Sequence, residues 1–323
     1  MASTEPVPPM LAAVAPPTAA ELRRQVQIGY LLAAAGAVLW STKGIFIKLA
    51  YAEGVDATTL LALRLGLSLP VYLVIGAFSL RDRHRDGRGL PSARAIAMTA
   101  FVGFLGYYVA SYTDFLGLQY ISAQFERMIL FTFPLFVVIF GALWFGQKVQ
   151  PMGLVAIGVS YAGIAVMFAG RAGGGEGSDV VVGTLWVLAA AIAFAFYQLL
   201  AKPLIAEVGP RLFTCIAMGA AAVVALGQFV VTHPLSDLAV SGAAWGYAIM
   251  LAIGATVIPS FLLAAALHRI TPQANSTIGM VSPVVTIGLA WLILGETLTL
   301  VDAAGALLVL AGVGWMALQD SRR

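Results

Sequence analysis

The chain contains 323 residues, of which 60% are hydrophobic and only 10% are charged, and its formal net charge is +3. A soluble globular chain carries about 25% charged residues, and a soluble fold of this size cannot hide so large an apolar fraction. The composition therefore excludes an ordinary soluble enzyme, a disordered chain and a nucleic-acid-binding module. The single cysteine, Cys215, excludes an intrachain disulfide, and with three dispersed histidines neither a metal site nor another cofactor is expected.

A bilayer core of about 30 Å requires about 20 apolar residues per helix, and ten stretches of the sequence meet this requirement. In chain order they are 28–50, 57–80, 94–117, 121–145, 151–170, 180–203, 211–232, 242–267, 272–294 and 299–318. Residues 1–27, which are rich in alanine and proline, are predicted to form a disordered N-terminal tail. The Gly-rich residues 171–179 are predicted to be a linker, and residues 319–323 a short C-terminal tail.

An even number of spans places both termini on the same side of the membrane. Most of the 18 basic residues fall in the loops on that side, whereas the opposite loops contain only Lys48 and Arg171. Positively charged loops stay in the cytoplasm. We therefore predict a multi-pass protein of a bacterial inner membrane with both termini in the cytoplasm.

The sequence also contains an internal repeat. Residues 121–134 align without gaps on residues 270–283, so that Pro134 matches Pro283. Repeats at a fixed offset indicate that one structural unit occurs twice in the chain.

Residues 28–170 and 180–318 are therefore predicted to be two repeats, which lie in opposite orientations because each contains an odd number of helices. The predicted fold is an all-α integral membrane protein with ten transmembrane helices as two inverted five-helix repeats. Inverted repeats that meet near the middle of the membrane are typical of secondary transporters. Duplication within a membrane scaffold or a membrane enzyme remains the alternative.

Several motifs carry a family resemblance: Trp40-Ser41 with Lys48, Arg64, Leu118–Ala123, Pro134, Gly146-Gln147-Lys148-Val149 and Gly295-Glu296-Thr297-Leu298. With these residues the chain resembles the EamA-like branch of the drug/metabolite transporter (DMT) superfamily over about residues 28–318. The resemblance implies ten helices and transport of a small molecule, but it does not identify the substrate. Gln147 departs from the acidic residue usual after this glycine in the family, so no charge-dependent role is expected for it.

Five charged residues fall inside predicted spans of the first repeat: Lys43, Arg64, Asp114, Glu126 and Arg127. Each costs at least about 2.5–3.5 kcal/mol in hydrocarbon and therefore needs a function or a partner. As a solute site, Arg64 or Arg127 would hold a carboxylate, and Glu126 or Asp114 would hold an amine or take up a coupling proton. The alternative is a structural network in which these arginines pair with the two acids while Lys43 extends to the interface. Both interpretations remain open.

Aromatic residues are further candidates for the wall of a solute site, although packing alone would also explain them. These candidates are Trp40, Tyr108, Tyr112 and Phe131. Pro134 and Pro283 fall near the middle of their spans, where a proline removes a backbone hydrogen bond and bends the helix. We predict that this pair of bends flanks the central pathway.

The predicted function is a secondary active transporter that exports a small zwitterionic or anionic metabolite, such as an amino acid, by alternating access. Its partners would be the solute, the lipid bilayer and protons as a coupling ion, with no nucleic acid, and the protein would be a monomer or homodimer. Broad-specificity drug efflux is the first alternative. An intramembrane enzyme and a non-transporting assembly protein are the others, and the sequence contains no nucleotide-binding or nucleophile motif that would favour an enzyme.

Overall fold

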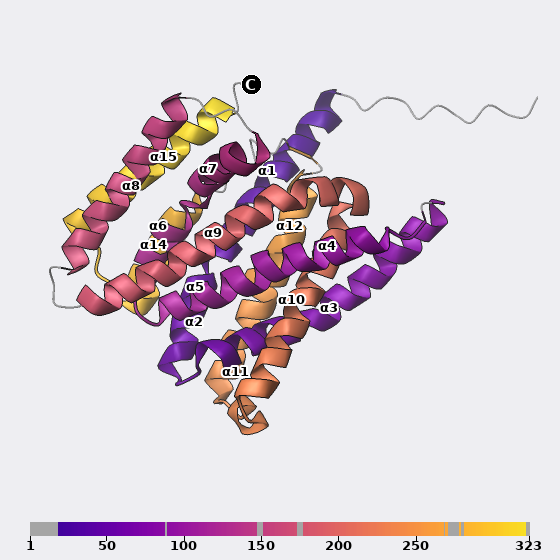
Figure 1. Ribbon diagram of the computed structural model, residues 1–323, viewed down its shortest axis with the longest axis horizontal. Coiled ribbons are helices and arrows are strands. Elements are labelled where there is room, and N and C mark those ends of the chain that lie inside the picture. Colours follow the sequence, from indigo (N-terminus) through magenta and orange to yellow (C-terminus); the bar gives the residue numbers. More distant parts are fainter. Residues whose placement is uncertain are drawn as a thin grey trace, which may run out of the picture.

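The structure is a computed structural model that describes residues 19–87, 89–146, 151–172, 177–267, 269–270, 278 and 281–320. These residues form a bundle of helices, and no strand occurs among them (Figure 1). The elements are α1 (Ala19–Ser41), α2 (Lys43–Ala52), α3 (Ala57–Arg85), α4 (Ala93–Gly103), η1 (Phe104–Val109), α5 (Ala110–Leu118), α6 (Ala123–Leu130), α7 (Phe133–Phe145), α8 (Pro151–Ala172), α9 (Gly177–Val208), α10 (Pro210–Thr232), η2 (Leu235–Leu238), α11 (Gly242–Ile249), η3 (Met250–Val257), α12 (Ile258–Leu267), α14 (Val281–Leu294) and α15 (Leu300–Asp320).

Within the described residues, seven helical segments are long and apolar enough to cross a membrane. The other three predicted spans correspond there to shorter apolar helices, Gly158–Gly170, Val281–Leu294 and Leu300–Gly312. The all-helical membrane class is thus confirmed, whereas the count of ten stays a prediction.

The helices extend further into the predicted tail and linker than expected. α1 begins at Ala19, so that residues 19–27 are helical, because glutamate, leucine, arginine and glutamine favour helix beyond the apolar stretch. α8 continues to Ala172 and α9 begins at Gly177. The remaining parts of the predicted tails and linker lie outside the described part of the chain; they are residues 1–18, 173–176 and 321–323.

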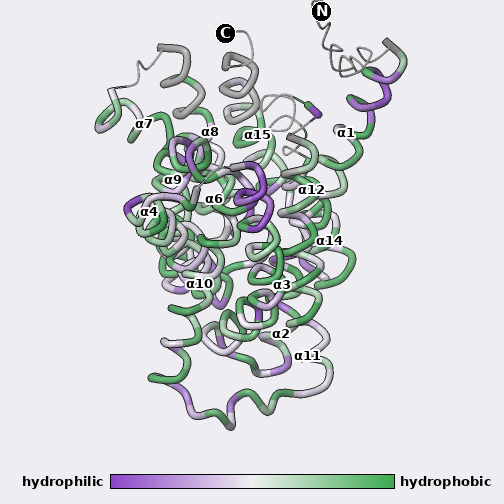
Figure 2. The backbone as a smooth tube through the Cα atoms, turned by 90° about the vertical axis from the view of Figure 1, so that its right-hand side faces the viewer, coloured by the Kyte–Doolittle hydropathy of each residue, from purple (hydrophilic) through white to green (hydrophobic). Residues whose placement is uncertain are grey.

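The two halves of the chain are interleaved. α8 packs against α15, α3 against α10, α5 against α9 and α1 against α12, so that every pair joins a helix of one half to a helix of the other. Figure 2 shows that α15 runs toward the end of the bundle from which α1 starts, whereas α11 and the junction of α2 with α3 lie at the opposite end.

Two of the membrane-crossing segments are interrupted. α1 and α2 are separated at Thr42, and α6 and α7 at Phe131 and Thr132. Each threonine hydroxyl donates a hydrogen bond to the carbonyl three residues earlier, at 2.6 Å in both cases. Pro134 lies in the first turn of α7, directly after its interruption. Pro283 is buried in the first turn of α14, and residues 279–280 before that helix are outside the described part of the chain.

Two other segments contain π-helical turns, which the sequence analysis did not predict. They are η1 and η3, which occupy the third predicted span of each half. In η3 the hydroxyl of Thr256 donates to the carbonyl of Leu251, at 2.8 Å. π-helical turns widen a helix locally and are frequent at functional sites.

A close contact between α4 and α10 requires glycine at position 103. A β-carbon added to Gly103 would overlap the backbone of Ala217. We expect Gly103→Ala to lower the free energy of unfolding by about 1–3 kcal/mol, because the backbone on the other side cannot move away cheaply. Thermal unfolding in detergent measures this effect. Gly227→Ala on α10 is the matched control, since its β-carbon would meet nothing within 4 Å, and equal melting temperatures for the two variants would refute the expectation.

Asp56 precedes α3 just outside the membrane-spanning segment and caps the first turn of the helix. Its carboxylate accepts hydrogen bonds from the backbone N–H groups of Thr58 (2.7 Å) and Thr59 (3.0 Å) and from the Thr59 hydroxyl. Burial by itself raises the pKa of Asp56, but the hydrogen bonds and nearby His233 outweigh burial and lower this pKa below its ordinary value. The carboxylate therefore stabilises the fold above the ordinary carboxyl pKa, and the contribution is lost as the pH falls through the lowered pKa.

Replacing Asp56 by alanine is expected to lower the free energy of unfolding by about 1 kcal/mol at neutral pH. Thermal unfolding of wild type and variant should show this difference shrinking in acid. Asp56→Asn keeps a side-chain acceptor at the cap and should retain most of the stability at neutral pH. A stability difference for the alanine variant that does not change with pH would contradict the assignment.

Candidate functional site

The five charged residues predicted inside the membrane come from four elements that contact one another. Lys43 lies on α2, Arg64 on α3, Asp114 on α5, and Glu126 and Arg127 on α6. Each keeps at most 6% of its surface exposed. Burial of this degree makes the partners of each charge decisive, because an unpaired buried charge is costly.

Lys43 and Asp114 form a close ion pair. Lys43 Nζ lies 2.6 Å from Asp114 Oδ2, which joins α2 to α5. Lys43 therefore points inward and does not extend to the interface, and the partner of Asp114 is this lysine and neither of the arginines. The second carboxylate oxygen, Asp114 Oδ1, receives no hydrogen bond from a donor in the described part of the chain, and the Asp114 carboxyl also lies close to that of Glu126.

Glu126 and Arg127 lie in the first two turns of α6 and are only loosely paired. The distance from Arg127 Nε to Glu126 Oε2 is 3.9 Å, which is too long for a hydrogen bond. Among the described residues, the Nε and Nη2 atoms of Arg127 have no hydrogen-bond acceptor, and neither oxygen of Glu126 receives a hydrogen bond from a donor. The carboxyl group of Glu126 lies within hydrogen-bonding reach of the Asp114 carboxyl, so the two acids can share a proton. A β-carbon added to Gly44 on α2 would lie 3.5 Å from Glu126 Oε2, so Glu126 faces α2 close to Lys43.

Arg64 is held by neutral groups. Its Nε donates to the hydroxyl of Thr256 on η3 at 2.9 Å, and its Nη1 donates to the hydroxyl of Ser111 on α5 at 3.1 Å. The guanidinium carbon lies 5.6 Å from the centre of the Phe115 ring. No ion pair between Arg64 and a carboxylate occurs in the described residues. Its positive charge is thus buried without direct neutralisation.

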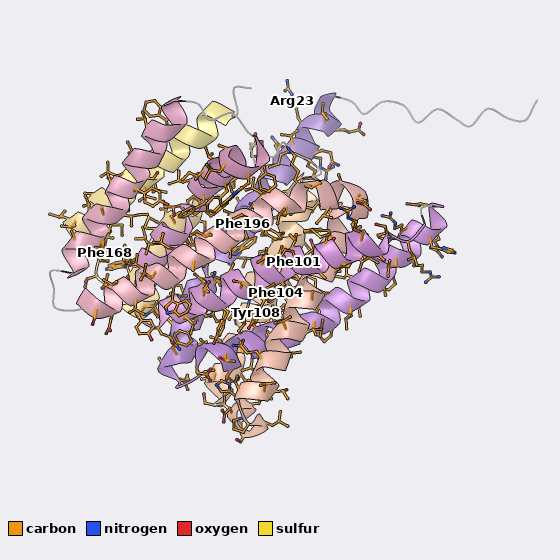
Figure 3. All side chains as sticks on the ribbon, in the orientation of Figure 1. Arg23, Phe101, Phe104, Tyr108, Phe168 and Phe196 are labelled. Carbon is orange, nitrogen blue, oxygen red and sulfur yellow. The ribbon has the colours of Figure 1, made fainter. Side chains whose placement is uncertain are left out.

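Tyr108 and Tyr112 form part of a stack along one side of η1 and α5. The rings of Phe104 and Tyr108 lie 5.4 Å apart, and those of Tyr108 and Tyr112 lie 6.0 Å apart with nearly parallel planes. Figure 3 shows Phe104 and Tyr108 one after the other along this element, near the centre of the view. The Tyr108 hydroxyl donates to Gln228 Oε1 on α10 at 2.7 Å, so this tyrosine already has a partner in the protein.

The two remaining aromatic candidates lie at or near the interruptions in the helices. Trp40 is half-buried near the end of α1, next to Ser41. Phe131 is half-buried between α6 and α7 and packs against a buried cluster that includes Phe125 and Met128. Neither residue is part of the stack of Tyr108.

The sequence analysis did not identify Ser111 and Thr256 as partners of Arg64, nor Ser282 as a partner of Ser41, whose hydroxyls lie 2.8 Å apart. Hydroxyl residues are common in apolar helices, and nothing in their spacing distinguishes those that contact a charge. The sequence could have indicated these partners only by their type, because a buried arginine needs polar partners and a hydroxyl in an otherwise apolar helix can supply one.

Comparison with known proteins gives matches over nearly the whole chain. The profile of the EamA-like transporter family matches residues 27–169 and again residues 181–318. The uncharacterized transporter YcbK of Bacillus subtilis is 26% identical over 319 residues, which cover 93% of this chain and 97% of that protein. An uncharacterized transporter of Archaeoglobus fulgidus is 23% identical over 277 residues, covering 86% of this chain and 92% of that protein.

A solved crystal structure shares the fold, with a TM-score of 0.61 at 18% identity over 91% of this chain and 97% of that chain. The family matches cover both halves of the sequence, and the apolar helices provide multiple membrane crossings. The chain therefore belongs to the EamA-like transporter family of the DMT superfamily and is a multi-pass membrane transporter.

Proposed function

We propose that this transporter exports a small zwitterionic metabolite, such as an amino acid, in exchange for protons. Export would run across a bacterial inner membrane in which both chain termini are cytoplasmic. The observation that carries the proposal is the incomplete pairing of Glu126 and Arg127, two buried side chains of opposite charge. Among the described residues no donor reaches either oxygen of Glu126, and no acceptor reaches Nε or Nη2 of Arg127. A buried polar atom without a partner costs about 1–3 kcal/mol, and more when it is charged, so such atoms are retained where a ligand completes them.

The unpartnered atoms of Arg127 match a carboxylate. Nε and Nη2 project from the same edge of the guanidinium, so their N–H groups can donate two parallel hydrogen bonds to the two oxygens of one carboxylate. The neighbouring Glu126 carboxylate can accept from an ammonium group. A solute that carries both groups a few ångströms apart fits both residues together.

Arg64 supports selection for a solute with a carboxylate. Its charge is buried, and within the described part of the chain its direct contacts are the hydroxyls of Thr256 and Ser111 and the Phe115 ring. An uncompensated positive charge among the helices of the site favours anionic groups. Arg64 would thus contribute to the potential that attracts the carboxylate, while Arg127 provides the direct contact.

Exchange with protons follows if Glu126 binds one cationic partner at a time. The buried carboxylate would hold either the solute ammonium or a proton, so that arrival of the proton releases the solute. Mutually exclusive binding at one carboxylate is sufficient to couple the two fluxes in opposite directions. Asp114, which is already paired with Lys43, is the less suitable carrier.

Alternating access requires some helices to change shape or position, and each half has a segment suited to this. η1 and η3 are π-helical segments in the third predicted span of each half, and such turns widen a helix locally. The interruptions at Thr42 and Thr132 adjoin the segments that carry Lys43 and Arg127. Interrupted helices beside a binding site are a common feature of transporters with inverted repeats.

Counterflow in proteoliposomes tests the proposal directly. Labelled neutral amino acids, small organic acids and lipophilic cations would be compared, each with and without a pH gradient. Saturable exchange of the zwitterions, with accumulation driven by the gradient, is the expected result. Exchange restricted to organic acids would refute the role of Glu126 in binding an amine, and the absence of exchange by folded protein would refute transport of this class.

Broad-specificity drug efflux is the second candidate, and the ring stack of Phe104, Tyr108 and Tyr112 is the observation that favours it. Aromatic faces bind flat lipophilic cations through stacking and cation–π contacts. In the same assay this function would appear as exchange of lipophilic cations without exchange of amino acids.

A further inference from the structure

A carboxylate from the second half of the chain caps the helix that carries the proposed site. Glu296, in the loop between α14 and α15, accepts a hydrogen bond from Ala123 N at 2.8 Å through Oε1 and from Gln124 N at 3.2 Å through Oε2. The Gln124 side-chain amide donates in turn to the Glu296 backbone carbonyl, at 3.2 Å. Both oxygens of the carboxylate are therefore used on the N-terminus of α6.

The hydrogen bonds of the Glu296 carboxylate to α6 are expected to be stronger than hydrogen bonds between neutral groups of a loop and a helix. The first N–H groups of a helix have no partner within the helix, and its N-terminal end carries a partial positive charge that favours an anion. Hydrogen bonds from backbone N–H groups to a carboxylate are about twice as strong as those between neutral groups. The Lys48 ammonium on α2 also interacts electrostatically with Glu296 and with Glu126, which places a positive charge between the cap and the proposed site.

The cap lies at the end of the bundle away from the chain termini. α15 runs toward the end at which α1 starts (Figure 2), and Glu296 lies in the short loop between Leu294, the last residue of α14, and Leu300, the first residue of α15. With cytoplasmic termini, this is the non-cytoplasmic end. Glu126 follows the capped residues within the first turn of α6, so any outward displacement of α6 from this loop must first break the Glu296 contacts.

We infer that Glu296 is a latch between the two halves, which holds the non-cytoplasmic end of the transporter closed over Glu126 and Arg127 until the solute is bound. By the offset of the internal repeat, its counterpart in the first half is Gln147, a neutral residue that lies outside the described part of the chain. At this position of the repeat, only the second half has a carboxylate. A stronger closure at the non-cytoplasmic end favours the conformation that faces the cytoplasm, which is the conformation an exporter uses to load its solute. The inference rests on the proposed alternating-access function.

Accessibility of a cysteine beneath the latch tests the inference without knowledge of the solute. In a Cys215→Ala background, Ala123→Cys places a small thiol at a position with no exposed surface. Its labelling by a membrane-impermeant maleimide, added to the non-cytoplasmic side of intact cells, reports opening of this end. Glu296→Gln should raise the labelling rate about tenfold, the change expected from the loss of one hydrogen bond to a charged group. Glu296→Ala should raise it further.

Two variants separate opening from misfolding. Gln124→Ala removes only the side-chain hydrogen bond and should give a smaller increase, while Glu53→Gln, at the same end of the bundle, should leave labelling unchanged. Each variant would be checked for a monodisperse peak by size-exclusion chromatography.

Equal labelling of the wild type and of both folded Glu296 variants would overturn the latch. A failure of wild-type counterflow with an intact labelling difference would instead overturn only the proposed transport of zwitterions.

Discussion

Glu126→Gln is expected to abolish solute accumulation driven by a pH gradient and to leave counterflow measurable. Glutamine keeps the shape of the side chain, but it cannot take up a proton and binds an ammonium group more weakly. Uphill transport should therefore fall to the level seen without a gradient, while the KM of counterflow should rise about tenfold. Parallel measurements of both activities in proteoliposomes check this split.

Glu207→Gln is the matched control, because it makes the same chemical change on an exposed residue of α9, and it should leave both activities unchanged. Gradient-driven accumulation that survives in the Glu126→Gln variant would remove the role of Glu126 as proton carrier. Loss of both activities from a folded variant would instead indicate that Glu126 is required for every step of the solute cycle, and coupling through this residue would be unsupported.

Arg127→Lys should raise the KM for zwitterionic solutes by about 10–100-fold, the range expected for losing one charge-assisted hydrogen bond. Lysine keeps the positive charge but cannot present the two parallel N–H groups that Nε and Nη2 offer to a carboxylate. The largest effect should be on KM, because the contact is made with the bound solute before the conformational change. Initial rates of counterflow over a range of solute concentrations provide this measurement.

Arg211→Lys provides the control for this substitution, since Arg211 is exposed on α10 and only weakly paired with Asp82, at 3.7 Å. Its KM should equal that of the wild type. An unchanged KM in Arg127→Lys would assign the carboxylate to another residue. Arg64 would be the next cation to replace, because it is also buried and no carboxylate of the described residues forms an ion pair with it.

The all-helical membrane class and the identity of the charged residues inside the membrane follow from the amino-acid sequence alone. Composition decides the class, because a chain with this apolar fraction has no soluble fold that could bury it. The positions of Lys43, Arg64, Asp114, Glu126 and Arg127 follow equally directly, since a charge inside a long apolar stretch stands out at once. The same stretch says nothing about the direction in which each side chain points.

The pairing of these charges, in contrast, depends on how the helices pack in three dimensions. Asp114 pairs with Lys43, which is 71 residues away in sequence, and Arg64 binds Thr256, which is 192 residues away. The cap of α6 by Glu296 crosses 173 residues. Hydrophobic periodicity reports the local environment of a helix face, whereas these partners depend on which helices pack together and on how far each is rotated and shifted. That arrangement is set by the sum of many side-chain contacts, and no local pattern in the sequence encodes it.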